Sequence, residues 1–195
     1  MPLTNRKRLL DRTINNRDAS LIIIATEGQE TEKQYFSIFG NPKVKVVVIP
    51  TTDGKSAPVH VLSRLDRIKN DYDLAADDTL WLMTDIDHIR DEQRSQICQE
   101  AIQKGFNLAV SNPCFELWLY LHFSDVTTTS ISCDQLEGKL RKILGSYNKA
   151  KLDLKKYIGQ VSSAVERARA LDINQNERWP NSIGTHVYKV VEKLI

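Results

Sequence analysis

The sequence has little cysteine and no long apolar run. Its three cysteines, Cys98, Cys114 and Cys133, are odd in number and contain no C-x-x-C pair. A structural zinc site and a framework of disulfide bonds are therefore not expected, and a reducing compartment fits best. No apolar stretch approaches the length of a membrane span, and none follows the basic N-terminal residues as it would in a signal peptide. We expect a cytoplasmic protein with no membrane association.

A complete phosphate-binding loop for nucleotide hydrolysis is also missing. The segment Gly54-Lys55-Ser56 resembles the end of a Walker A motif, but Ile49 stands where that motif requires its first glycine. The chain is therefore not expected to hydrolyse ATP by itself. A loop that leads into the next helix explains the segment better.

Charge is unevenly distributed along the 195 residues. The formal net charge is +2 for the whole chain, but it is +3 over residues 1–18, −6 over residues 19–133 and +5 over residues 134–195. An acidic centre between basic ends suits a metal-binding core beside surfaces that contact phosphate groups. Chance asymmetry on solvated faces would give the same pattern, and charge alone does not separate the two interpretations.

Four short apolar runs alternate with stretches of helical periodicity. The runs cover residues 21–25, 44–49, 79–84 and 106–110. Each is too short for a helix, and an apolar run of this length is typical of a strand that is buried on both faces. Strands that alternate with helices predict an α/β fold, here a four-stranded parallel sheet flanked by helices.

The pattern changes after residue 123. No convincing strand follows, and three helices are predicted near residues 133–145, 161–171 and 182–194. We therefore predict three parts. They are a basic flexible arm over residues 1–18, an α/β core over residues 19–123 and a helical extension over residues 124–195 that packs on the core.

Acidic side chains follow three of the four predicted strands. Glu27 comes after the first strand, Asp85 and Asp87 after the third, and Glu116 a few residues beyond the fourth. The carboxyl ends of parallel strands meet at one edge of a sheet, where ligands bind. Clustered carboxylates repel one another unless a cation neutralises them, and hard oxygen ligands select Mg²⁺ or Mn²⁺. A site of this kind suits the hydrolysis of phosphate esters, although Asp-x-Asp after a strand is also common in turns and helix caps.

A basic stretch in the C-terminal part is the candidate nucleic-acid-binding surface. It contains Lys149, Lys151 and Lys156, and Lys149 lies close to Tyr147. Lysines of this kind can contact phosphate groups, with Lys149 as the first choice, or form an ordinary solvated face. His88, next to Asp87, is a further candidate ligand or proton carrier, but most histidines beside a site are only neighbours.

Several segments together resemble the RloB-like protein family. They are EGQETEKQYF at residues 27–36, TDID at 84–87, SNPCFELWL at 111–119, ARAL at 168–171 and PNSIGT at 180–185. The resemblance extends from about residue 20 to the end of the chain. No single segment is specific, but the combination is.

The resemblance implies a Toprim fold with a magnesium site. The Toprim pattern is a glutamate after the first strand and Asp-x-Asp after the third, which Glu27, Asp85 and Asp87 match, while Glu116 corresponds to the later acidic position of nuclease-type Toprim domains. The family further implies a bacterial antiphage role, with an ABC- or AAA-type ATPase partner and abortive infection by cleavage of nucleic acid, including tRNA.

The predicted function is therefore a metal-dependent endonuclease that acts on DNA or RNA. The four carboxylates would be both metal ligands and catalytic residues. The alternative is a catalytically silent subunit of an ATPase complex that binds nucleic acid or nucleotide. A homo-oligomer is compatible with either function.

Overall fold

The computed structural model describes residues 19–51, 57–71, 74–86 and 90–195. The predicted basic arm, the Gly54-Lys55-Ser56 segment, Asp87 and His88 lie outside these ranges. The predictions made for them therefore stay predictions.

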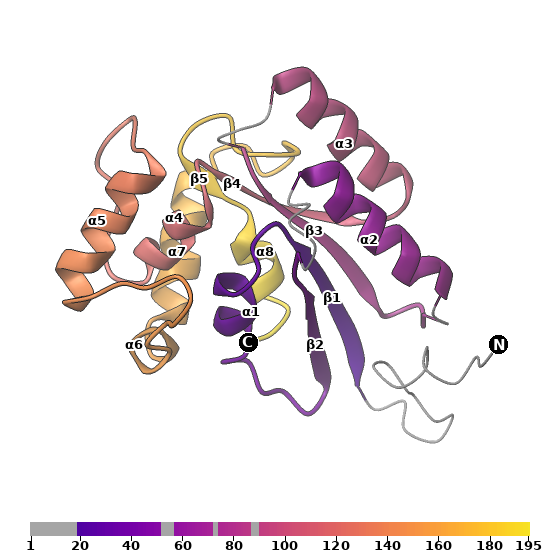
Figure 1. Cartoon of the computed structure of the whole chain (residues 1–195), viewed down its shortest axis with the longest axis horizontal. Helices are drawn as coiled ribbons and strands as arrows, with labels where there is room; N and C mark the ends of the chain where they lie inside the picture. The colour runs from indigo at the N-terminus through magenta and orange to yellow at the C-terminus, as the bar shows by residue number, and fades with distance from the viewer. Residues whose placement is uncertain (1–18, 52–56, 72–73, 87–89) are drawn as a thin grey trace.

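A five-stranded sheet forms the centre of the molecule, with the strand order β2-β1-β3-β4-β5 (Figure 1). The strands are β1 (Ser20–Thr26), β2 (Val44–Ile49), β3 (Thr79–Asp85), β4 (Asn107–Asn112) and β5 (Gly184–Thr185). Strands β1 to β4 are parallel to one another, and β5 is antiparallel to β4. The predicted α/β fold is confirmed, and its four apolar runs are the four parallel strands.

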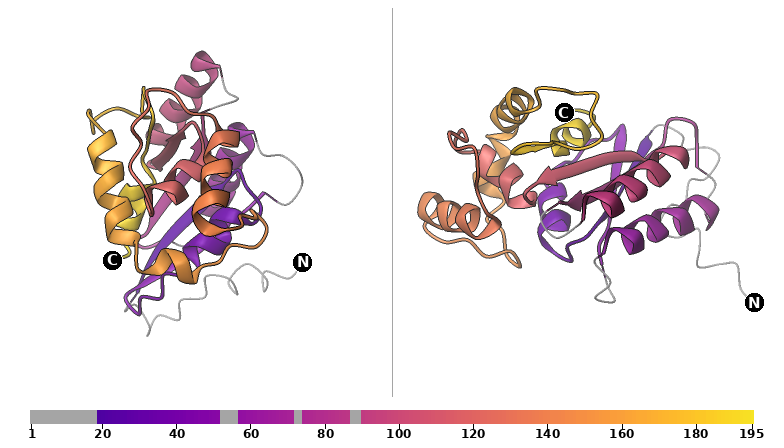
Figure 2. Two further views of the ribbon diagram at one scale, coloured as in Figure 1. Left: turned by 90° about the vertical axis from the view of Figure 1, so that its left-hand side faces the viewer. Right: turned by 90° about the horizontal axis from the view of Figure 1, so that it is seen from above.

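Helices cover both faces of the sheet. They are α1 (Thr31–Phe36), α2 (Pro58–Asp71), α3 (Asp91–Gln103), α4 (Phe115–Leu121), α5 (Cys133–Leu144), α6 (Lys155–Ile158), α7 (Val161–Leu171) and α8 (Val187–Val191). Side chains of α2 and α3 pack with Leu21, Ile23 and Leu82 in the core on one face. The core on the other face joins α1, α4, α7 and α8 to Ile22 and Ile24. Figure 2 shows these two helical layers on opposite sides of the sheet. Residues 21–25 of β1 thus alternate between the two cores, which explains why this run is apolar throughout.

Helix α4 is the centre of the larger core. All seven of its residues are buried, and it packs against α5 and α7 as well as the sheet. A helix that is buried on every side needs neighbouring elements on every side. The C-terminal helices supply part of that cover.

His122, directly after α4, is a buried part of this core. One ring nitrogen, Nε2, lies 3.1 Å from the Tyr35 hydroxyl, and Nδ1 lies 3.0 Å from the Trp118 carbonyl oxygen. Burial lowers the pKa of His122 to about 4. The folded protein therefore keeps this ring neutral at a pH where the unfolded chain protonates it.

We expect this buried histidine to make the protein less stable in acid. Stability falls as pH decreases from about 6.5, where the unfolded histidine begins to bind a proton, to about 4, where the folded one does. At about 1.4 kcal/mol per pKa unit, the loss is about 3 kcal/mol. Denaturant unfolding of the wild type and of His122→Gln at pH 7 and pH 4 measures it, since other groups titrate equally in both proteins. Parallel pH profiles would show that His122 does not carry this dependence.

The C-terminal part differs from the prediction at the start of its last helix. The expected helix over residues 182–194 begins only at Val187, because Gly184 and Thr185 instead form β5 beside Asn112 and Ser111. The Ser111 and Thr185 hydroxyls lie 2.9 Å apart, and Asn112 Nδ2 donates to the Pro180 carbonyl oxygen at 3.1 Å. A two-residue strand carries no periodicity in the sequence. It forms only because β4 offers it an unpaired edge.

The cysteines also differ from the prediction. Cys114 and Cys133 are bonded to each other, with their Cα atoms 6.1 Å apart, and Cys98 is free and buried. Cys114 precedes α4 and Cys133 begins α5, so the bond joins two helices that already pack together. Their spacing of 19 residues carries no sequence signal for this contact.

No helix in the described ranges is both long and apolar enough to cross a membrane.

Candidate metal centre

A cavity of about 220 Å³ lies at the carboxyl edge of the sheet, where β1, β3 and β4 end. Its lining residues are Glu27, Gly28, Thr31, Glu32, Asp85, Phe115, Glu116 and Lys149. The structure thus brings together three of the four carboxylates singled out in the sequence, Glu27, Asp85 and Glu116. The fourth, Asp87, lies outside the described residues.

Local chain geometry places the carboxylates at this edge. Glu27 directly follows β1, Asp85 is the last residue of β3, and Glu116 lies in the first turn of α4. The backbone N–H of Asp85 donates to Glu27 Oε1 at 3.3 Å, so the ends of the two neighbouring strands are linked directly.

Glu32 is a fourth acidic residue in the cavity that the sequence did not single out as a site residue. It lies in the first turn of α1, its side chain is buried, and its Oε1 accepts a hydrogen bond from the Gly28 N–H at 3.3 Å. An acidic residue early in a helix is usually an exposed partner of the helix dipole. Only its burial beside Glu116 and Asp85 distinguishes Glu32 from such a residue.

The carboxylates affect one another's protonation. Burial raises the pKa of Asp85 well above its ordinary value, and the negative charges of Glu27, Glu32 and Glu116 raise it further. Burial also raises the pKa of Glu32, and Glu116 adds to that effect. Without a cation, the fully ionised cluster is therefore unfavourable at neutral pH.

Lys149 supplies a positive charge at the rim. Its Nζ lies 3.0 Å from Glu116 Oε1 and 2.9 Å from Glu137 Oε1. The Tyr147 hydroxyl also donates to Glu116 Oε1, at 3.2 Å. Burial opposes the charge on Lys149, but hydrogen bonds to Glu137 and Glu116 outweigh it and raise its pKa. Half of this side chain is still exposed to solvent.

Helix α1 holds the loop that carries Lys149. The Lys149 carbonyl oxygen accepts hydrogen bonds from Thr31 Oγ1 at 3.1 Å and Gln34 Nε2 at 3.3 Å. Gln34 Oε1 accepts a bond from the Leu152 N–H at 2.9 Å. The lysine side chain is therefore aimed at the carboxylates by contacts that span more than 100 residues of sequence.

The other two lysines of the predicted basic surface do not line the cavity. Lys151 is exposed. Lys156 donates to the Leu144 carbonyl oxygen at 2.8 Å and lies 3.7 Å from Asp153. Of the three lysines, the structure therefore places only Lys149 at the carboxylate cluster.

The ligand chemistry of the cavity fits a hard divalent cation. Every acidic side chain in its lining offers carboxylate oxygens, and one of these oxygens, Glu32 Oε2, is buried with no hydrogen-bond partner among the described residues. Within those same residues, no three His, Cys, Asp or Glu side chains already converge as a ready-made metal site. An ion would therefore have to draw the carboxylates together, with Asp87 as a further candidate ligand.

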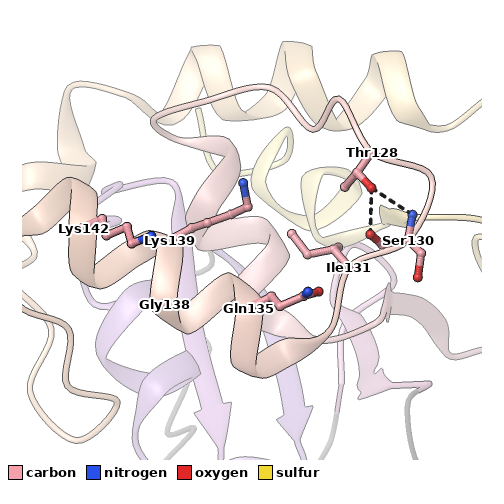
Figure 3. A pocket seen from close by; sticks show the side chains of 7 residues that line it. All are labelled: Thr128, Ser130, Ile131, Gln135, Gly138, Lys139 and Lys142. Carbon is pink, nitrogen blue, oxygen red and sulfur yellow. Dashed lines mark hydrogen bonds between the residues drawn. The ribbon is translucent and has the colours of Figure 1, made fainter.

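A larger cavity, of about 490 Å³, lies between α5 and the segment before it (Figure 3). Lys139 and Lys142 line it together with Gln135 and Ile131, and the Thr128 hydroxyl bonds to Ser130 at its edge. Its lining contains no carboxylate. It is therefore not a candidate for the metal.

Comparison with known proteins gives one match. A family model described as RloB-like protein matches residues 22–194, which is nearly the whole chain. No curated protein and no solved structure matches the chain.

Proposed function

The chain belongs to the RloB-like protein family, and we propose that it is a Toprim-type metal-dependent endonuclease. Its substrate would be DNA or RNA, tRNA included, and its role that of the toxic effector in bacterial antiphage abortive infection. One observation carries the proposal: Glu27, Asp85 and Glu116 come from separate elements and line one cavity at the carboxyl edge of a parallel sheet.

In this proposal Glu27, Asp85, Asp87 and Glu116 hold Mg²⁺ or Mn²⁺. Bound there, the ion would polarise a phosphate oxygen and activate water. The raised pKa values of Asp85 and Glu32 support the proposal, because a divalent cation would relieve the repulsion that causes part of each shift.

In this proposal Lys149 balances the charge of the carboxylates and contacts the substrate. Its ammonium group balances Glu116 and Glu137, and its exposed half is available to a phosphate group of the substrate. The Tyr147 hydroxyl donates to the same Glu116 oxygen that Lys149 contacts, and so helps to fix this carboxylate. Lys151 and Lys156 would bind the substrate backbone further from the cavity.

Cleavage in a defined mixture tests the function. The full-length protein, alone and with an ATPase encoded beside it, is incubated with plasmid DNA, phage DNA and total tRNA in Mn²⁺. We expect products from at least one substrate and none after EDTA. If no substrate is cut under any of these conditions, the alternative of a catalytically silent binding subunit is favoured. The lack of a preformed three-ligand group among the described residues is compatible with that alternative.

An ATPase partner is part of the proposal. The sequence has no complete Walker A motif, so control by nucleotide would have to come from another chain of the ABC or AAA type. Co-expression with such a partner should give growth arrest on infection.

Lys149→Ala should weaken nucleic-acid binding. Removing one phosphate contact is expected to reduce the slope of log K against log salt by about 0.7–0.9. A salt titration of binding to single-stranded and double-stranded probes measures it, with exposed Lys33→Ala as the control. Equal slopes for wild type and Lys149→Ala would show that this lysine has only its structural partners, Glu116 and Glu137.

A further inference from the structure

The carboxylate of Glu32 is buried inside the cavity and incompletely bonded. Its residue is 7% exposed, and it lines the same cavity as Glu27 and Asp85. Oε1 accepts the Gly28 N–H, while Oε2 is buried with no hydrogen-bond partner among the described residues. A buried carboxylate oxygen without a partner is unfavourable, and in a cavity lined by other carboxylates a cation is the natural partner.

Gly28 makes the room that this carboxylate occupies. A Cβ atom at position 28 would collide with Glu32 Oε2 and lie 2.6 Å from Oε1 and 2.7 Å from Cδ. Any side chain at this position would therefore have to displace the Glu32 carboxylate. The glycine is needed for close approach to a side chain, not for an unusual backbone angle.

Lys149 forms ion pairs with two other carboxylates, those of Glu116 and Glu137. Its Nζ lies 3.0 Å from Glu116 and 2.9 Å from Glu137. Glu116 thus has a lysine and the Tyr147 hydroxyl as partners, whereas Glu32 Oε2 has neither. Glu32 Oε2 can therefore accept a bond from a ligand in the cavity without giving up a hydrogen bond to the protein.

We infer that Glu32 is an additional ligand of the divalent cation, bound through Oε2 beside Glu27 and Asp85. The inference rests on the proposed function and extends it. The ligand set includes a residue of α1, and Gly28 is the positioning residue that lets its carboxylate enter the cavity.

A calorimetric titration tests the inference independently of cleavage. The metal-free full-length protein is titrated with Mn²⁺ alone, and the affinity is measured. Glu32→Gln keeps the shape of the side chain and removes its charge. We expect Mn²⁺ to bind this variant at least about 10-fold more weakly than the wild type, since even outer-shell partners contribute about 10–100-fold to metal affinity. Glu30→Gln is the matched control, because Glu30 is exposed at the start of the same helix. It should bind Mn²⁺ within about twofold of the wild type.

A second variant tests whether Gly28 affects metal binding through Glu32. Gly28→Ala should displace the Glu32 carboxylate and weaken Mn²⁺ binding as well. In the Glu32→Gln background it should weaken binding much less, because both changes act on the same ligand. Circular dichroism shows whether each variant is folded, so that affinity is compared only among folded proteins.

The outcomes distinguish this inference from the proposed function. If the wild type binds Mn²⁺ and Glu32→Gln binds it equally well, Glu32 is not a ligand, and the proposed function is unaffected. If Gly28→Ala and Glu32→Gln weaken binding in a fully additive way, Gly28 does not act through Glu32. If the wild type itself binds no Mn²⁺, the proposed metal site fails, and the inference fails with it.

Discussion

Replacing Asp85 by asparagine is expected to abolish cleavage while making the metal-free protein more stable. Asparagine has the same shape but no charge, so it cannot hold a divalent cation as the carboxylate would. Changing an outer-shell partner of a metal typically lowers activity about 10–100-fold, and loss of a ligand should lower it by more than about 100-fold. The proposed endonuclease activity would then be undetectable in an ordinary gel assay.

The gain in stability follows from the raised pKa of Asp85. Because the folded protein binds this proton more tightly than the unfolded chain, the metal-free wild type loses stability as pH rises from the ordinary carboxyl range through the raised pKa. The asparagine variant lacks this loss, so its melting temperature at pH 7 should be the higher one. In a protein of this size each kcal/mol corresponds to about 2–4 °C.

Thermal unfolding without Mn²⁺ measures the gain in stability, and unfolding with Mn²⁺ shows whether the ion still binds. The wild type should be stabilised by Mn²⁺, and Asp85→Asn should not respond. Asp77→Asn is the matched control, because Asp77 is exposed just before the opposite end of β3. It should behave as the wild type does. An Asp85→Asn protein that is less stable than the wild type without metal, or that still cleaves, would contradict this assignment of Asp85.

Trp118→Ala should cause the largest loss of stability of any single change considered. Trp118 is completely buried in α4, and its ring lies edge-on to Tyr35 and to His122, at 5.9 and 5.1 Å between centroids. Truncating a buried tryptophan removes its apolar contacts and leaves a cavity, which typically destabilises a protein by about 3–5 kcal/mol. This is a large part of the about 5–15 kcal/mol that stabilises a typical domain.

Denaturant unfolding measures the loss. Ile173→Ala is the control, because this side chain is 91% exposed and its removal should change stability by no more than about 0.5 kcal/mol. Since α4 also carries Glu116, the tryptophan variant should lose Mn²⁺ binding together with stability. A loss below about 1 kcal/mol would mean that the core around α4 tolerates a cavity of this size.

The parallel sheet and much of its edge can be predicted from local patterns in the sequence. Short β-branched runs separated by amphipathic stretches are a local signal, and they predicted β2 and its bounds without error. The rule that ligands meet at the carboxyl ends of parallel strands then predicted that Glu27, Asp85 and Glu116 would lie together, and the structure places all three in one cavity. Whether they bind a metal stays a prediction.

Which other groups join these three carboxylates depends on how distant elements pack. Glu32 looks like a surface residue in the sequence, but the folded chain buries it at the cavity. Lys149 and Tyr147 reach Glu116 across 33 and 31 positions of the chain. Strand β5 and the bond between Cys114 and Cys133 depend in the same way on distant partners. The physical reason is that periodicity reports the environment of a residue within its own element. A contact between elements depends on how their surfaces pack, and no local pattern records that.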